Sequence, residues 1–387
     1  MVTVAGVVFS ITIVVLQLAS SQFGPRVLRN FMSDRGNQVV LGTFTSAFVY
    51  CLLVLAAVRD DPKGFVPVMA VWFGLFLGVA GIGVLIFFIH HIAQSIRVER
   101  VVGNIASELD AAVDRLFPEE VGDEPDEDAA RRQVPENFAQ YARAVRSGRS
   151  GYIRGIDGDE LLRLARDRSL VVRLERRPGD FVCEGMLLAC AYPLDRADDE
   201  TAAEIEAVFA VGIDRTPQQD IDYVLRQLTQ IALRALSPGI NDPFTAIECI
   251  NRLKQGLRRA SSRPRPSQYR LDKSGRLRVI AQADEFLPLA IPQLDSIARA
   301  GGDNGDIVSL LFEVIDAIAE NARYEDDRNE VFASALSLKQ ESDIRLNRSR
   351  DRDQVARAYA SLIRTAIPAG CTVKKGPSPA RVREQAG

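Results

Sequence analysis

The chain has 387 residues, of which 47% are hydrophobic and 26% charged, and its formal net charge is −3. This near-neutral balance argues against a nucleic-acid binder, which usually carries a basic face or tail. The five cysteines are scattered and the chain has only two histidines, so the sequence contains no zinc-binding pattern. We therefore expect no metal, no cofactor and no nucleic-acid partner, and thiols that stay reduced.

The composition divides sharply along the chain, because the first 97 residues are apolar and the rest are rich in charge. Three apolar runs contain no Asp, Glu, Lys or Arg: Val2–Ala19, Val39–Val58 and Phe65–Ile92. A helix needs roughly 20 mostly apolar residues to cross the hydrocarbon core of a bilayer. The sequence therefore predicts a membrane α-helical bundle of three transmembrane helices over residues 1–97, with the lipid bilayer as a partner.

Basic residues near the ends of these runs predict the orientation of the bundle. Arg26, Arg29 and Arg35 lie between the first two runs, and Arg97 and Arg100 follow the third. Because Lys and Arg are enriched in cytoplasmic loops, this loop and the C-terminal region are expected in the cytoplasm. The first residue would then face outside, and we infer at least one further helix upstream in the natural protein, giving four.

Polar residues recur on one face of each of the first two apolar runs. The candidates for lining a pore are Thr3, Ser10, Gln17 and Ser21 in the first run, and Thr43, Ser46 and Tyr50 in the second. Residues seven apart lie on one face of a helix. Small polar residues also let neighbouring helices approach and hydrogen-bond. Two interpretations stay open, namely close packing between helices and a wet pathway lined by hydroxyl groups and an amide.

Two further groups are candidates for contact with the membrane interface. The segment Phe23–Met32 reads as a short amphipathic helix that carries Arg26 and Arg29, either in the headgroup layer or as a lip of the bundle. His90 and His91 lie at the inner end of the third run. They favour a polar anchor at the interface, and the alternative is a proton sensor, because imidazole titrates near neutral pH.

After residue 97 the patterns predict a cytoplasmic α+β region. Ser95–Phe117 is expected to extend the third membrane helix, and an acidic linker follows it. Two glycine-bearing turns around short apolar strands resemble half of the barrel-sandwich fold of lipoyl and biotinyl carrier domains, although Leu174–Leu188 holds no lysine to modify. The expected domains are 1–97 transmembrane, 98–146 connecting helix and linker, 147–196 small β module, 197–368 mostly helical with a β-hairpin at 269–281, and 369–387 disordered tail.

The most distinctive stretch of the soluble region runs from Arg215 to Ala246. Thr216 and Gln219 are predicted to form the capping box of one helix, and Ser237-Pro-Gly is predicted to end it. Asp242 followed by Pro243 is predicted to begin the next helix. The rival interpretation is a turn that binds a ligand or a partner through Arg226, Gln227, Asn241, Asp242 and Thr245.

Several segments together resemble a known family. They are Thr3–Thr12, Gln17–Phe31, Phe88–Ile92, Arg177–Val182 and Leu236–Ala246. The chain resembles the bacterial predicted membrane proteins that carry domain of unknown function 2254. Members begin earlier, with a further helix pair, so the resemblance implies a multi-pass protein of the bacterial inner membrane whose first helix or helices are missing here. It implies no activity.

Two functions therefore remain under consideration. The first is a homo-oligomeric pore or transport-like protein, with a small ion as a candidate solute and a cytoplasmic regulatory domain. The alternative is a membrane-anchored scaffold or ligand-sensing protein without transport, which binds an unknown cytoplasmic ligand. We do not expect an enzyme, because the sequence has no metal-ligand set, nucleophile elbow or phosphate loop, and no histidine in the soluble region.

Overall fold

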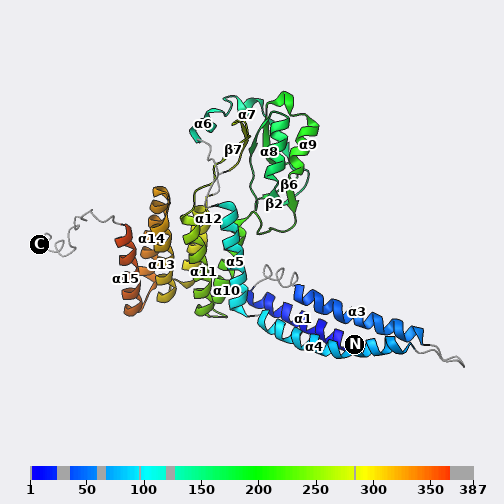
Figure 1. Ribbon diagram of the computed structural model, residues 1–387. Coiled ribbons are helices and arrows are strands. Elements are labelled where there is room, and N and C mark those ends of the chain that lie inside the picture. The colour runs from blue at the N-terminus through cyan, green and yellow to red at the C-terminus, as the bar shows by residue number, and fades with distance from the viewer. Residues whose placement is uncertain are drawn as a thin grey trace.

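The computed structural model describes residues 2–23, 35–58, 67–95, 97–118, 127–282 and 285–366. Figure 1 shows three parts. Helices α1, α3 and α4 form an elongated bundle, which we call the apolar bundle. Helix α5 and helices α10–α15 form a helical region, and the strands with α6–α9 form a β lobe above it. The predicted tail at 369–387 lies outside the described residues.

The apolar bundle consists of α1 (Val2–Phe23), α3 (Arg35–Ala57) and α4 (Val68–Ser95). Two of its segments, Gly36–Ala57 and Val68–Gln94, are long and apolar enough to cross a membrane, and only 17% and 11% of an apolar 18-residue stretch in each is buried inside the molecule. The corresponding segment of α1 is shorter, Gly6–Leu18. A helix in the core of a soluble protein would be mostly buried, so these exposed apolar surfaces indicate membrane association, with two rather than three candidate spans among the described residues.

Helices α3 and α4 pack as an antiparallel pair. The Tyr50 hydroxyl donates a hydrogen bond to the Ala70 carbonyl oxygen at 2.9 Å, and the Tyr50 ring meets the Phe73 ring edge-on at 5.3 Å. The end of α3 therefore lies beside the beginning of α4. Helix α1 packs against α3, and its buried side chains include Val8 and Val15.

The expected continuation of the third apolar run as one helix through Ser95–Phe117 is wrong. Helix α4 ends at Ser95, Arg97 adopts an extended conformation with ψ 128°, and a separate helix α5 (Val98–Leu116) begins next. The chain changes direction at this point (Figure 1). The break has a packing reason, because it lets the apolar face of α5, including Ile105 and Leu109, pack against α10 and α11.

The helical region accounts for most of the described residues of the second half of the chain. Its other members are α10 (Ile221–Ala235), α11 (Pro243–Ser261), α12 (Leu287–Gly301), α13 (Gly305–Asn321), α14 (Glu325–Arg345) and α15 (Ser349–Ala366). Asp220, and not Thr216, caps α10, because its side chain accepts a hydrogen bond from the Tyr223 amide. The predicted cap of α11 is confirmed at Asp242, with Pro243 at the first helical position.

In the part of the β lobe that the structure describes, eight strands form two sheets. The strands are β1 (Arg143–Arg146), β2 (Gly151–Ile156), β3 (Val171–Leu174), β4 (Phe181–Val182), β5 (Leu187–Tyr192), β6 (Phe209–Gly212), β7 (Tyr269–Leu271) and β8 (Leu277–Ile280). One sheet has the order β1-β5-β3-β8-β7 and the other β4-β2-β6. The short helices are α6 (Glu127–Arg132), α7 (Phe138–Tyr141), α8 (Gly158–Asp167), a 3₁₀ turn (Leu194–Arg196) and α9 (Asp199–Ala207).

The sheets extend beyond the limits of 147–196 predicted for the β module. Strands β1 and β6 flank that range, and the predicted hairpin of β7 and β8 joins it because β8 pairs in parallel with β3, with Val172 opposite Val279. Parallel pairing needs a long connection, here residues 175–276, which include helices α10 and α11 of the helical region, and local sequence patterns do not reveal it. This two-sheet arrangement does not confirm a barrel-sandwich module.

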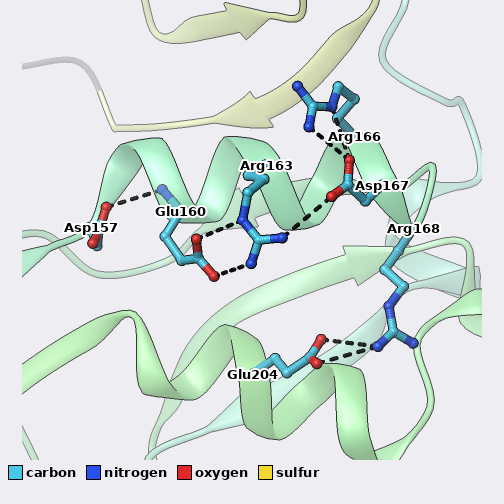
Figure 2. A network of polar contacts seen from close by, with 7 residues as sticks. All are labelled: Asp157, Glu160, Arg163, Arg166, Asp167, Arg168 and Glu204. Atoms are coloured by element: carbon cyan, nitrogen blue, oxygen red, sulfur yellow. Dashed lines mark hydrogen bonds and ion pairs between the residues drawn. The ribbon is translucent and has the colours of Figure 1, made fainter.

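The surface of α8 carries a ladder of ion pairs (Figure 2). Arg163 binds Glu160 on one side and Asp167 on the other, and Arg168 reaches Glu204 of α9 at 3.2 Å. The hydrogen bond from Arg163 holds the pKa of Glu160 below its usual value. Exposed pairs of this kind contribute little to stability, so α8 provides surface charges that can be changed as controls.

Candidate functional sites

The polar stripe of α1 faces away from the rest of the apolar bundle. Val8 and Val15 are buried, whereas Thr3, Ser10 and Gln17 are exposed. At 3.6 residues per turn, Ser10 lies about 200° around the helix from Val8, on the opposite side. The side chain of Ser21 lies outside the described residues. The stripe is therefore a row of polar groups on an exterior that is otherwise apolar.

The polar residues of α3 are arranged differently. The Thr43 hydroxyl donates to the Val39 carbonyl oxygen of its own helix at 2.8 Å, and Tyr50 bonds to α4. Ser46 is exposed. Because Tyr50 faces α4 while the α1 stripe faces outward, one copy of the chain does not bring the two stripes together.

His90 takes part in a polar relay across the break between α4 and α5. Arg100 donates from Nη2 to Gln94 Oε1 at 2.8 Å, and Gln94 Nε2 lies 2.6 Å from His90 Nε2. His91 stacks on Phe87 with 5.5 Å between ring centroids. This arrangement links the end of the apolar bundle to α5. Arg26 and Arg29, the other interface candidates, lie outside the described residues.

The five residues of the predicted ligand turn do not form one site. Arg226 and Gln227 lie in the first half of α10, and the other three follow its end. Asp242 accepts hydrogen bonds from the Thr245 amide at 3.2 Å and the Thr245 hydroxyl at 2.6 Å, so this pair closes the cap of α11. Asn241 adopts a left-handed conformation with φ 49°.

Gln227 and Arg226 point to different surroundings although they are adjacent in sequence. Gln227 is buried, 3% exposed, and its Oε1 atom has no hydrogen-bond partner. Arg226 is half exposed and lines a cavity at the junction of the β lobe and the helical region. Of the five candidates, Arg226 is the one that the structure places in this cavity.

This junction cavity has a volume of about 340 Å³. One wall is the loop Arg177–Phe181 of the β lobe with Tyr152, and the other is Arg215 and Gln219–Asp222 with Arg226 of α10; Leu116 and Leu289 complete the lining. Three arginines and three aspartates therefore surround one small space. The sequence presents Arg177–Val182 and Arg215–Ala246 as separate motifs, and no local pattern shows that they meet.

The floor of the junction cavity is a buried ion-pair network. Arg215 donates from Nε to Asp220 Oδ2 at 2.6 Å, and from Nη2 to Asp220 Oδ1 at 2.7 Å and Asp222 Oδ2 at 2.9 Å. Burial disfavours the charged guanidinium, but its hydrogen bonds to Asp220 and Asp222 outweigh burial and raise the pKa of Arg215. Bidentate pairing of this kind fixes orientation as well as charge.

Polar residues before α10 tie this floor to the β lobe, in place of the predicted capping box. Gln219 accepts from the Ile156 amide at 2.9 Å and donates to the Ile156 carbonyl oxygen at 3.2 Å. The Thr216 hydroxyl donates to the Arg154 carbonyl oxygen at 3.2 Å. These side chains therefore act as partners of β2 and not as caps, because β2 offers them backbone groups that the short sequence pattern does not reveal.

Metal ligands do not cluster in the described residues, where no group of three or more His, Cys, Asp or Glu could hold an ion.

The family model described as Predicted membrane protein (DUF2254) matches residues 1–317. The chain is also 34% identical over 329 residues to uncharacterized proteins of Mycobacterium bovis (strain ATCC BAA-935 / AF2122/97) and Mycobacterium tuberculosis (strain ATCC 25618 / H37Rv). These alignments cover 83% of this chain but only 62% of each relative. No solved structure matches the chain. The protein therefore belongs to the family of predicted membrane proteins that carry domain of unknown function 2254.

Proposed function

We propose that the protein is a homo-oligomeric pore or transport-like protein, in which the α1 stripes of neighbouring copies meet and line a passage. The observation that carries this proposal is the exposure of Ser10 and Gln17 on the side of α1 opposite its packing face. In hydrocarbon a polar side chain without a hydrogen-bond partner is costly, so such a face favours contact with another polar face or with water. The α1 stripe of a second copy would supply the polar face, and a passage between the two stripes would hold the water.

The proposed topology has α1, α3 and α4 crossing the bacterial inner membrane, with the C-terminal region in the cytoplasm. At 1.5 Å per residue, the 22 residues of α1 reach about 33 Å, enough for a hydrocarbon core of about 30 Å. Helices α1 and α4 end, and α3 begins, where the bundle adjoins the helical region (Figure 1). Arg35, Arg97 and Arg100 lie at this end, as the positive-inside rule requires of a cytoplasmic side.

Flux measurements in liposomes test the pore. We expect purified protein to conduct a small cation such as K⁺, and the double substitution Ser10→Leu with Gln17→Leu to abolish that flux. Val14→Leu is the matched control, because Val14 is exposed on the same helix but is already apolar. Equal flux through all three proteins, or none through the wild type, would contradict the proposal.

Cross-linking tests the oligomer separately. In a background without native cysteines, Ser10→Cys should form a disulfide-linked dimer in the membrane, because the stripes of two copies would face each other. Val8→Cys should not, because Val8 is buried within one copy. Cross-linking at both positions or at neither would contradict the proposed interface.

The alternative is a membrane-anchored ligand-sensing protein without transport, and the junction cavity favours it. This cavity lies between two parts of the soluble region and combines arginines from both of them. Under this alternative the α1 face would serve only for assembly, so the cross-link would form without flux.

A further inference from the structure

We propose that the junction cavity binds a phosphate group through the guanidinium groups of Arg177 and Arg226. The inference rests on the ligand-sensing alternative above and does not require a pore.

Arg226 presents free donors to the cavity. Its Nε atom donates to Asp222 Oδ2 at 2.7 Å, which fixes the plane of the guanidinium. No described residue accepts a hydrogen bond from its two Nη atoms. Because each Nη atom carries two N–H groups, a held guanidinium of this kind presents an oriented fork to an incoming anion.

Arg177 is the second donor, and it comes from the β lobe. Its nearest carboxylate oxygen, Asp180 Oδ1, lies 3.9 Å from Nε, which is too far for a hydrogen bond. The other oxygen of Asp180 accepts the backbone amide of Arg177 at 3.1 Å. Among the described residues, therefore, the side chain of Arg177 has no hydrogen-bond acceptor, although it lines the cavity.

The third arginine, Arg215, pairs with the carboxylates of Asp220 and Asp222. Arg215 is only 17% exposed, and both Asp220 and Asp222 receive its hydrogen bonds. Asp222 also lies within 3.5 Å of the Gln293 side-chain amide. The three arginines and three aspartates sum to zero formal charge, so the preference of this cavity comes from directed N–H groups and not from a net positive field.

Phosphate fits these donors better than carboxylate does. The guanidinium groups of Arg177 and Arg226 belong to different parts of the chain. A carboxylate has two oxygens, and one guanidinium fork already occupies both of them. A phosphate has at least one further oxygen for the second arginine. The ligand would then join the loop at Arg177 to α10, a helix that also contacts α1 and α5. Phosphate could come from a soluble compound or from a lipid headgroup.

Binding to the full chain tests the site, with the protein in detergent for the soluble anions and in detergent-free amphipol for the vesicles, which detergent would dissolve. The probes are inorganic phosphate, acetate at equal ionic strength, and vesicles of phosphatidylglycerol compared with vesicles of phosphatidylcholine. We expect saturable binding of phosphate or of the anionic vesicles, and at least a 10-fold loss of affinity in Arg226→Gln and in Arg177→Gln. Phosphate binding would identify a soluble source, and binding of the anionic vesicles alone would identify a headgroup.

Matched variants separate a site from a general charge effect. Arg163→Gln removes one exposed, ion-paired arginine of α8 (Figure 2) and should leave the affinity unchanged. Arg226→Lys keeps the charge and should also bind at least 10-fold more weakly, because lysine lacks the fork. Equal affinity for acetate, an equal loss in Arg163→Gln, or no saturable binding of any probe would overturn the proposal. None of these outcomes depends on ion flux.

Discussion

Gly179 lies directly against Asp220, and a Cβ atom at Gly179 would stand 2.6 Å from Asp220 Oδ2. Gly179 also has φ +93°, in the region that favours glycine. Its amide donates to the Ile153 carbonyl oxygen at 2.8 Å, which holds the loop to β2. The loop that carries Arg177 therefore packs directly against the carboxylate of Asp220, which Arg215 binds.

Gly179→Ala should therefore destabilise the protein and weaken phosphate binding. We expect a cost of about 1–3 kcal/mol from the backbone conformation, plus displacement of the loop from Asp220. Gly185→Ala is the matched control, because Gly185 has φ +79° but a Cβ atom there meets no atom within 4 Å. Thermal unfolding midpoints should fall in both variants and phosphate affinity only in Gly179→Ala. Equal effects on affinity would show that the contact with Asp220 has no special role.

The turn of the β7–β8 hairpin depends on the carboxylate of Asp272. It accepts hydrogen bonds from the Ser274 hydroxyl at 2.6 Å, the Ser274 amide at 2.9 Å, the Arg276 amide at 3.2 Å and Arg278 Nε at 2.7 Å. The bond from the Ser274 hydroxyl, followed by that from Arg278, holds the pKa of Asp272 well below its usual value. A depressed pKa stabilises the fold above the unfolded pKa of about 3.9, and the contribution is lost as pH falls toward the folded value.

Asp272→Asn should lower the stability by about 1–3 kcal/mol at pH 7, because the ionised acceptor is lost. The difference from the wild type should shrink as pH falls below about 4, because the carboxylate of the unfolded wild-type chain binds a proton there while the folded carboxylate stays ionised. Urea unfolding at pH 7, 5 and 3 measures this. Asp199→Asn, which removes an exposed carboxylate, should change stability by less than about 0.5 kcal/mol. A pH-independent difference for Asp272→Asn would contradict the assignment.

The cysteines should differ in reactivity. Burial, with smaller effects from Glu248 and Asp242, raises the pKa of Cys249 to about 12. Its thiol therefore stays protonated and covered at pH 8, whereas Cys183 is exposed. Iodoacetamide at pH 8, followed by mass spectrometry, should modify Cys183 in the native protein and Cys249 only after denaturation. Rapid native modification of Cys249 would contradict the packing of α11.

Gln227→Leu should leave the stability unchanged or raise it by about 1 kcal/mol. The Oε1 atom of Gln227 is buried without a hydrogen-bond partner. Removing this unsatisfied polar group stabilises the folded state, and this gain can offset the cost of packing a leucine of slightly different shape. Gln230→Leu is the control, since Gln230 is polar, lies on the same helix and makes a polar interaction. A clear loss of stability in Gln227→Leu would instead indicate that Gln227 has a partner such as a bound water or ligand.

Local features of the fold can be read from the amino-acid sequence. Neighbouring residues supply the hydrogen bonds of two such features, the Asp242 cap of α11 and the hairpin turn at Asp272–Arg276. A third feature, the long apolar runs, depends only on the preference of apolar side chains for lipid over water. Physical rules for caps, turns and membrane spans therefore identify them without knowledge of the rest of the chain.

Packing between distant segments decided the remainder. The side chains of Thr216 and Gln219 suit a helix cap, yet they bond to β2, because tertiary contacts supply better partners. In the same way, the parallel pairing of β3 with β8, the outward direction of the α1 stripe and the placement of Arg177 and Arg226 around one cavity each depend on which surfaces come together. Short-range periodicity carries no information about such contacts, because the same polar side chain can find a hydrogen-bond partner either in its own helix or in a distant segment.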